Sequence, residues 1–394
     1  MAGLFESFTA RLAADWKHRK TEEKLSRNYR CRCGTPVFFR NTQCLTCKSP
    51  LGYLPEATSI VTLDAGPEPG VVHAEGHAES YKLCANRETP AGCNWLLPAG
   101  DPYSLCIACR LNRTIPNLDD ADNAGYWSRI ELAKRRLVAQ LLAVGLPVKS
   151  KLDEDPEHGL MFDFLRSPPG GPAVMTGHAN GLITINVEEA DDVKREKIKH
   201  DLHEPYRTLL GHFRHEVGHY YWDRLVRDSA WLAPYRELFG DERASYAEAL
   251  KRNYEQGPPA NWPNSYISSY ATTHPWEDWA ETWAHYLHIV DSLGTALGFG
   301  LEAGDLDYTT IKPFTLDDLY ARDDPGAARF LSILNSWIEM IMVLNELARS
   351  LGEPDFYPFV MSKPVVAKLQ LIQMIVAGER DDAAARQDVA SAPG

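Results

Sequence analysis

Residues 211–223 read "GHFRHEVGHYYWD", and this stretch constrains the fold more strongly than any other part of the chain. It contains two histidines, His215 and His219, four positions apart, with Glu216 directly after the first. On an α-helix such positions lie on one face, about 5–6 Å apart, so two imidazoles can bind one tetrahedral ion. The glutamate beside them can take a proton from water that the ion activates. The stretch therefore predicts a metal-binding helix with its own general base.

The residues around this motif favour the helix that it requires. Leu210, Phe213 and Val217 recur on one helical face, while the histidines fall on another. One side of the helix can therefore be buried while the imidazoles point elsewhere. Asp223, one turn after His219, is placed to hold an imidazole N–H, as carboxylates near metal sites do. An ordinary solvated acidic residue is the equal alternative for Asp223.

A catalytic zinc ion needs a third protein ligand, and the candidates lie in residues 270–288, "YATTHPWEDWAETWAHYLH". The tryptophans of this stretch recur at helical spacing and mark the buried face of a second helix. Glu277, near the start of that helix, is the predicted third ligand. Glu281 is the alternative ligand or a partner that orients a zinc-bound histidine, and His274 is the rival third ligand.

All eight cysteines lie in a region with many Gly, Pro and short β-type runs. They form two predicted groups of four, Cys31, Cys33, Cys44 and Cys47, followed by Cys84, Cys93, Cys106 and Cys109. The first group has the close ligand pairs of a zinc ribbon, and the second ends in a good Cys-x-x-Cys half. We therefore predict two structural zinc ions, each held by four thiolates. Disulfides are the alternative, and His73 or His77 could replace one cysteine.

The composition is that of an ordinary globular protein of 394 residues, 44% apolar and 24% charged, and this length suggests two or three domains. A net charge of −13 repels phosphate backbones, so we expect no general nucleic-acid binding. No secretory signal is evident at the N-terminus. The most apolar stretch, residues 330–347, contains Asn335, Ser336 and Glu339, which predicts a buried helix rather than a membrane span. We therefore expect a cytoplasmic protein.

Three stretches of the chain together resemble a known family. They are "YRCRCGTPVFFRNTQCLTCKSPLGYLP" (29–55), "TGHANGLITIN" (176–186) and "EPYRTLLGHFRHEVGHYYWDRL" (204–225). Over most of residues 28–365 the chain is similar to zinc-binding metallopeptidases that carry an N-terminal zinc-ribbon region. The resemblance implies an α+β fold, in which a β-rich ribbon region precedes a zincin-like, mostly helical peptidase domain with a small edge β-sheet. In such folds an edge strand, here "GLITINV" (181–187), pairs with extended substrate; an interior strand is the alternative.

The chain divides into four predicted segments. They are an N-terminal amphipathic helix (1–27), a zinc-ribbon region (28–112), a zincin-like metallopeptidase domain (113–378) and a disordered tail (379–394). Residues 110–123 are interpreted as a linker, and a helix is predicted from 124 to 144. The N-terminal helix either packs on the body of the protein or docks a partner.

A more distant similarity is to the lethal-factor type of gluzincin peptidase. In that type a tyrosine precedes the glutamate ligand by seven residues, and Tyr270 precedes Glu277 by seven. The similarity implies that the Tyr270 hydroxyl donates to the oxyanion formed during hydrolysis.

These residues together predict a zinc-dependent metallopeptidase that acts on proteins or peptides and is most simply an endopeptidase. His215, His219 and Glu277 would bind the zinc ion. Glu216 would act as base and then acid, and Tyr270 would stabilise the tetrahedral intermediate. One alternative is a SprT-like protease acting on DNA-bound proteins, although those use a third histidine and place the ribbon last. Another is a zinc-ribbon module that binds a partner protein and uses the peptidase fold as a scaffold, although the intact Glu216 counts against it.

Overall fold

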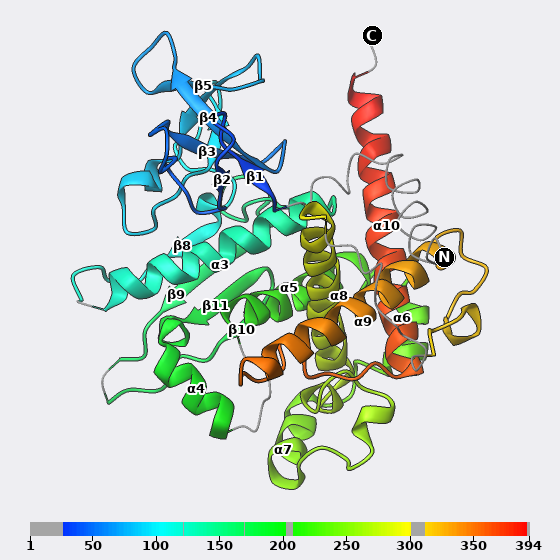
Figure 1. Ribbon diagram of the computed structural model, residues 1–394. Helices are drawn as coiled ribbons and strands as arrows, with labels where there is room; N and C mark the ends of the chain where they lie inside the picture. The colour runs from blue at the N-terminus through cyan, green and yellow to red at the C-terminus, as the bar shows by residue number, and fades with distance from the viewer. Residues whose placement is uncertain (1–26, 121, 169, 202–207, 301–311, 392–394) are drawn as a thin grey trace. The chain divides into compact units, whose positions relative to one another are not determined.

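The computed structural model describes residues 27–391 apart from 121, 169, 202–207 and 301–311. Contacts divide the chain into two compact units. The ribbon–sheet unit consists of Lys20–Phe213 with Gly294–Phe299, and the helical unit mainly of Arg214–Leu293 and Gly300–Gly394. Figure 1 shows the elements of both units in chain order.

Two antiparallel sheets carry the cysteine region. The first pairs β1 (Tyr29–Arg30) with β2 (Pro36–Val37). The second has five strands in chain order, β3 (Leu51–Leu54), β4 (Ser59–Ala65), β5 (Val71–Ala74), β6 (Ser80–Leu83) and β7 (Leu96–Pro98). Buried aromatic rings pack beside these strands: the ring centroid of Tyr53 lies 5.0 Å from that of Phe39 and 4.6 Å from that of Trp95. Strands this short enclose little apolar volume, so bound metal would be a large part of their stability.

A mixed sheet and a long helix complete the ribbon–sheet unit. The sheet order is β10 (Gly177–Ala179), β11 (Leu182–Asn186), β9 (Met161–Leu165) and β8 (Asn112–Thr114), and the helices are α3 (Asn123–Ala143) and α4 (Asp192–Asp201). The predicted helix over 124–144 matches α3 to within one residue at each end. The linker predicted over 110–123 is wrong at Asn112–Thr114, because β8 pairs in parallel with β9 and satisfies its backbone groups there.

The strand predicted to lie at a sheet edge is an interior strand. β11 pairs with β9 on one side and with β10 on the other. The cause is the turn at Asn180 and Gly181, whose φ angles of 48° and 79° are both left-handed. Two such residues close the tightest β-hairpins, so β10 folds back along β11 and takes the edge.

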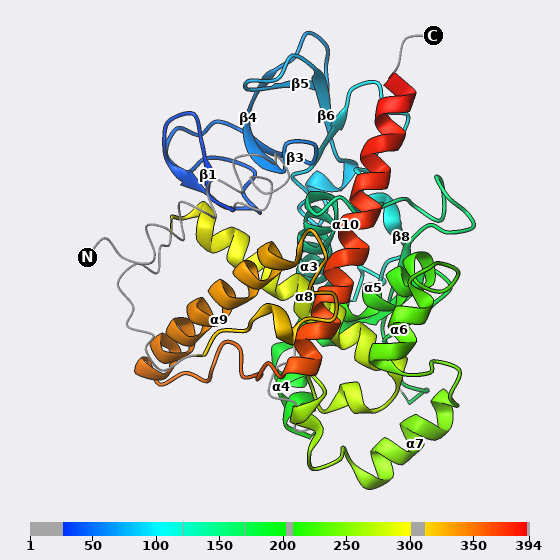
Figure 2. The ribbon, with the colours of Figure 1, turned by 90° about the vertical axis from the view of Figure 1, so that its right-hand side faces the viewer.

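Among the described residues, six α-helices contribute to the helical unit. They are α5 (Leu209–Leu225), of which the part from Arg214 belongs here, α6 (Leu232–Phe239), α7 (Tyr246–Gln256), α8 (Pro275–Gly298), α9 (Ala327–Ser350) and α10 (Lys363–Ser391). Figure 2 shows α10 between α6 and α9, and contacts join it to both. Short 3-10 helices cover Ala85–Glu88, Cys109–Leu111, Val187–Ala190, Trp262–Asn264, Tyr270–Thr272 and Leu316–Asp318 across the two units.

Helices α5 and α8 cross at very short range. A Cβ atom added at Gly218 of α5 would lie 3.0 Å from the Cα of Ala280 and 3.2 Å from the Cβ of Trp283, both on α8. A larger residue at Gly218 would have to push these atoms back by a few tenths of an ångström, so glycine favours the close approach of the two backbones. Trp279 closes the crossing by donating its Nε1–H to the Gly218 carbonyl oxygen over 2.8 Å. The crossing brings the first turn of α8, with Glu277, to the face of α5 that bears the histidines.

The predictions for the two chain ends have different outcomes. The N-terminal helix at 1–27 lies almost entirely outside the described residues. The disordered tail predicted from residue 379 is wrong as far as Ser391, because α10 continues to that residue. The Ala, Arg, Glu and Gln residues of this stretch are good helix formers, and they extend a helix that is already nucleated.

The most apolar stretch of the sequence lies in α9. Among the residues that the structure describes, this is the one helix long and apolar enough to cross a membrane, by length and composition alone. Its buried side chains, including Phe330, Leu334 and Trp337, cover 28% of the most apolar window, while Leu347 is 55% exposed. The prediction of a buried helix therefore holds for one face of α9.

Candidate metal centre and cysteine clusters

Three predicted ligands meet in the helical unit. Helix α5 presents His215 and His219 one turn apart, with ring centroids 4.9 Å from each other. The first turn of α8 presents Glu277, whose Oε2 lies 3.0 Å from Nε2 of His215 and 3.6 Å from Nε2 of His219. The three ligand atoms all lie within 4.8 Å of one another. We call these three residues the triad.

The triad has the spacing and chemistry that a zinc ion requires. Bonds of about 2.0–2.1 Å in a tetrahedron separate two ligand atoms by roughly 3.3 Å, which lies between the two measured distances. Oε2 of Glu277 is buried and accepts no hydrogen bond of good geometry. A carboxylate oxygen withdrawn from water in this way is costly unless positive charge lies beside it, from a protonated histidine or from a metal cation. The residues therefore fit a zinc site.

A second carboxylate orients one of the histidines. Oε1 of Glu281 lies 2.7 Å from Nδ1 of His215, and Oε2 of Glu281 accepts a hydrogen bond from the Ser268 hydroxyl over 2.6 Å. The carboxylate thus takes the Nδ1–H and leaves the Nε2 lone pair to face the ligand point, as in many zinc sites. Of the two alternatives that the sequence left open for Glu281, the geometry favours the orienting partner.

The electrostatics of the triad favour positive charge at its centre. Burial by itself raises the pKa of Glu277, but the attraction of His219 and His215 outweighs burial and holds this pKa well below its usual range. Burial by itself lowers the pKa of His215, and Glu277 and Glu281 outweigh it and raise this pKa well above its usual range. Two carboxylates therefore stabilise positive charge where solvent cannot, and a metal cation is one way to supply that charge.

The two predicted catalytic side chains lie close to the triad. Glu216 is buried within the histidine motif of α5, with 8% of its surface exposed. Tyr270 lies in the short helix Tyr270–Thr272, and its ring centroid is 6.0 Å from that of His215. Burial raises the pKa of Tyr270, so its hydroxyl keeps its proton and can donate.

The rival third ligand, His274, is engaged elsewhere. Its Nε2 donates to the carbonyl oxygen of Ala244 over 3.0 Å, and its Nδ1 accepts from the backbone N–H of Trp276 over 3.1 Å. Both ring nitrogens thus hold the start of α8 in place, and the His274 alternative is wrong. Asp223 forms an ion pair with Arg227, and the charge of His219 also acts on the Asp223 carboxylate.

The first cysteine group, which we call the exposed cluster, is partly open to solvent. It consists of Cys31, Cys33, Cys44 and Cys47, of which Cys33 and Cys47 are exposed. The Sγ atoms of Cys31 and Cys47 lie 3.5 Å apart, and those of Cys33 and Cys44 lie 3.7 Å apart. Four sulfurs at about 2.3 Å from a tetrahedral zinc ion would be roughly 3.8 Å apart, whereas a disulfide bond is about 2.05 Å long. The spacing fits zinc.

The second cysteine group is fully enclosed. The buried cluster consists of Cys84, Cys93, Cys106 and Cys109, none more than 1% exposed. The Sγ atoms of Cys93 and Cys106 lie 3.7 Å apart, and Cys84 Sγ accepts from the Cys106 backbone N–H. All eight cysteines of the two clusters are free, so the disulfide alternative is wrong in this structure. Each four-residue group is made of cysteine alone, without His73 or His77.

Charged side chains of α3 reach the buried cluster. Glu131 Oε2 lies 4.0 Å from Cys109 Sγ, and Lys134 and Arg135 pair with Glu131 at 2.8 and 3.7 Å. The Arg135 guanidinium also donates to the carbonyl oxygen of Ala91 over 2.8 Å. Although burial lowers the pKa of Arg135, the thiolates and Glu131 raise it further, so its positive charge is held beside the sulfurs. These contacts join α3 directly to the cysteine region.

Sequence reasoning missed two sets of contacts around these sites. Tyr246, the first residue of α7, donates to Oε1 of Glu277 over 2.8 Å across 31 residues of sequence. The charges of α3 beside the buried cluster were missed as well. Ser245 can be recognised from the sequence as a helix cap. Such a signal predicts where a helix begins but not which side chain its first residues contact.

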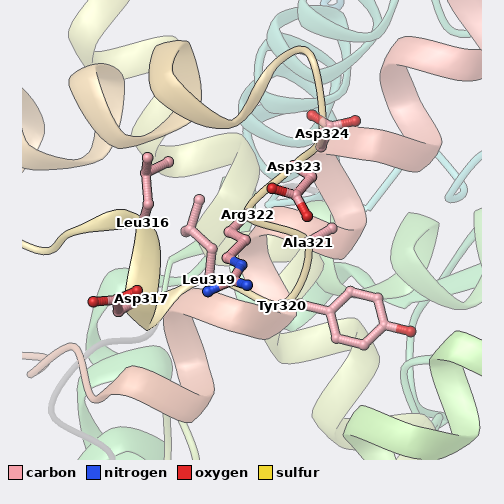
Figure 3. Close-up of a pocket in the computed structure, with 8 residues that line it drawn as sticks. All are labelled: Leu316, Asp317, Leu319, Tyr320, Ala321, Arg322, Asp323 and Asp324. Atoms are coloured by element: carbon pink, nitrogen blue, oxygen red, sulfur yellow. The ribbon is translucent and has the colours of Figure 1, made fainter.

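A cavity of about 480 Å³ lies elsewhere in the helical unit. Its walls are Leu316, Asp317 and residues 319–324, and Figure 3 shows that these side chains come from one continuous stretch of chain, with Asp317, Arg322 and Asp323 among them. No triad residue lines it, so this cavity is separate from the candidate metal centre.

The chain thus carries two histidines on one helix, a glutamate on a second helix and two groups of four cysteines. Such a set of donor groups defines a zinc-binding protein. The family described as "Putative zinc-binding metallo-peptidase" matches residues 123–375, and a zinc-ribbon domain matches residues 28–120. The chain belongs to this metallopeptidase family, which the sequence resemblance predicted.

Three mycobacterial proteins are similar to the chain along most of its length. They are "Uncharacterized protein Rv2568c" and "Uncharacterized protein MT2644" of Mycobacterium tuberculosis and "Uncharacterized protein Mb2598c" of Mycobacterium bovis. Each is 42% identical over 355 residues, which are 89% of this chain and 95% of the relative. No solved structure matches the chain.

Proposed function

We propose that the protein is a zinc-dependent peptidase, and most simply an endopeptidase. The observation that carries the proposal is the convergence of His215 Nε2, His219 Nε2 and Glu277 Oε2 beside Glu216. Membership of the metallopeptidase family supports it. The proposed substrate is a protein or peptide.

Each residue of the site has a proposed task. A zinc ion bound there would polarise the scissile carbonyl group and lower the pKa of water to about 7. Glu216 takes a proton from the attacking water and returns it to the leaving amine. The Tyr270 hydroxyl donates to the oxygen that becomes negative in the transition state. Glu281 keeps the His215 ring oriented through its Nδ1–H.

The metal content follows from the three donor groups. We propose three zinc ions per chain, one held by the triad and one by each cysteine cluster. Four-thiolate sites are closed and structural, whereas the triad leaves a coordination position for substrate. The two kinds of site would therefore differ in function although they bind the same ion.

The proposal is tested by Glu216→Gln, which keeps the size of the side chain and removes its basicity. Wild-type protein and the variant are incubated with a peptide library, and new termini are counted by mass spectrometry. We expect cleavage by the wild type and a loss of at least about 10²-fold in the variant, with zinc content unchanged. Equal cleavage by both proteins, or none by the zinc-loaded wild type, would reject the peptidase proposal.

A further inference from the structure

The two oxygens of the Glu277 carboxylate have different environments. Oε2 faces the histidines and accepts no hydrogen bond of good geometry. Oε1 instead accepts the hydroxyl proton of Tyr246 over 2.8 Å. A tyrosine on α7 thus engages the oxygen that lies away from the ligand point. Oε1 is thus occupied by the Tyr246 hydroxyl, and Oε2 is the oxygen available to bind an ion.

We propose that Tyr246 is a positioning residue of the metal centre, which holds Glu277 in the orientation that presents Oε2 alone. The last torsion of a glutamate side chain is broad and roughly two-fold, so it does not choose one oxygen by itself. A hydrogen bond to a charged acceptor is stronger than a neutral one, so the Tyr246 hydroxyl can make that choice. The inference rests on the proposed zinc site and not on hydrolysis.

The position of Tyr246 is itself fixed against α8. The carbonyl oxygen of Ala244 accepts from Nε2 of His274, which precedes α8 by one residue. The ring of Tyr246 lies edge-on to that of His274, with centroids 5.4 Å apart. The start of α7 is therefore attached to the start of α8 both at Ala244 and at Tyr246. Because these contacts flank Glu277, the hydroxyl is placed before any ion binds.

The test is the zinc affinity of the triad in Tyr246→Phe. Zinc is stripped from the triad with a mild chelator while the cysteine clusters stay loaded, and the triad is titrated against a chromophoric zinc chelator. Loss of such an orienting contact typically weakens metal binding 10–100-fold, and we expect a fall in that range. Tyr320→Phe is the matched control, since its hydroxyl donates to Glu237 over 3.0 Å at the surface of the same unit. The control should bind zinc as the wild type does.

A double-mutant cycle separates positioning from a merely structural role. In a Glu277→Ala background, Tyr246→Phe should cause no further loss of zinc affinity, because its effect passes through Glu277. With an empty triad, Tyr246→Phe should lower the melting temperature of the wild-type chain, because it removes a donor from a buried carboxylate, but not that of the Glu277→Ala chain. Wild-type zinc affinity in Tyr246→Phe, or a loss of affinity or of melting temperature that persists without Glu277, would overturn the inference. If Glu277→Ala alone retains full zinc affinity, the proposed ligand set fails instead.

Discussion

The two cysteine clusters use the same four sulfur ligands in opposite surroundings. In the exposed cluster, the Sγ atoms of Cys33 and Cys47 point to surface hydroxyls, those of Thr35 and Ser49, at 3.2 and 3.3 Å. In the buried cluster the sulfurs are enclosed and lie beside the ion-paired charges of α3. A site surrounded by water needs little from the rest of the fold, whereas a buried site with net negative charge needs counter-charges. The comparison indicates that the buried cluster is part of the core, whereas the exposed cluster has two of its four cysteines at the surface.

The largest expected effect comes from removing one ligand of each cluster. Cys106→Ser should prevent stable folding of the ribbon–sheet unit, because structural zinc contributes on the order of 10 kcal/mol to a small domain. Cys33→Ser should lose one zinc ion and lower the melting temperature by only a few degrees. Circular dichroism and zinc content of the two variants measure the difference. Equal losses would show that exposure does not distinguish the clusters.

A smaller effect is expected from the counter-charges. Arg135→Met removes the buried guanidinium beside the sulfurs while keeping much of its volume. Breaking a buried pair in this way typically costs about 3–5 kcal/mol. The neighbouring Arg136 is exposed and its guanidinium lies 5.5 Å from the ring centroid of Phe39, so Arg136→Met should change the free energy of unfolding by no more than about 1 kcal/mol. Urea denaturation compares the two, and similar midpoints would contradict a role for α3 in holding the buried cluster.

The smallest effect concerns thiol reactivity after zinc is removed. Donation from the hydroxyl and backbone N–H of Ser49 lowers the pKa of Cys47 to about 6, and burial raises that of Cys93. Because the pKa of Cys47 in the folded chain lies below the ordinary 9.0, its thiolate is stable above about pH 6 and is lost as the pH falls through that value. Brief treatment with iodoacetamide at pH 7 should therefore label Cys47 before Cys93. Mass spectrometry gives the order, and faster labelling of Cys93 would mean that the buried cluster opens without its metal.

Local signals in the sequence were sufficient for the parts of the fold that depend on spacing. The four-residue repeat of His215 and His219 predicted α5, and the tryptophan pattern predicted α8 with Glu277 in its first turn. The paired cysteines predicted two four-sulfur groups that the structure brings together. Each of these patterns lies within one stretch of sequence, so it is visible without the fold.

The parts that could not be predicted depend on packing across long stretches of chain. The hydrogen bond from Tyr246 to Glu277 and the contact of Glu131 with Cys109 join residues 31 and 22 positions apart, and no local pattern marks either pair. The edge position predicted for residues 181–187 follows from the resemblance to zincin folds, and in the structure β10 takes that position. The Asn180-Gly181 turn is a known hairpin signal and could have corrected that assignment.

Gly218 helps to fix the distance between the ligands of the metal centre, which no single ligand can do by itself. Because the backbone of α5 lies almost in contact with Ala280 and Trp283, the two helices have no room to move closer, and the hydrogen bond from Trp279 opposes their separation. The span between the histidines and Glu277 is therefore set by a helix crossing and not by the ion. A site of fixed, narrow span suits an ion with bonds near 2.0–2.1 Å and few ligands, and it disfavours larger ions such as Ca²⁺ that need six or more oxygens. Gly218, one residue before His219, would in this way favour the zinc ion that we propose for the triad over a larger ion.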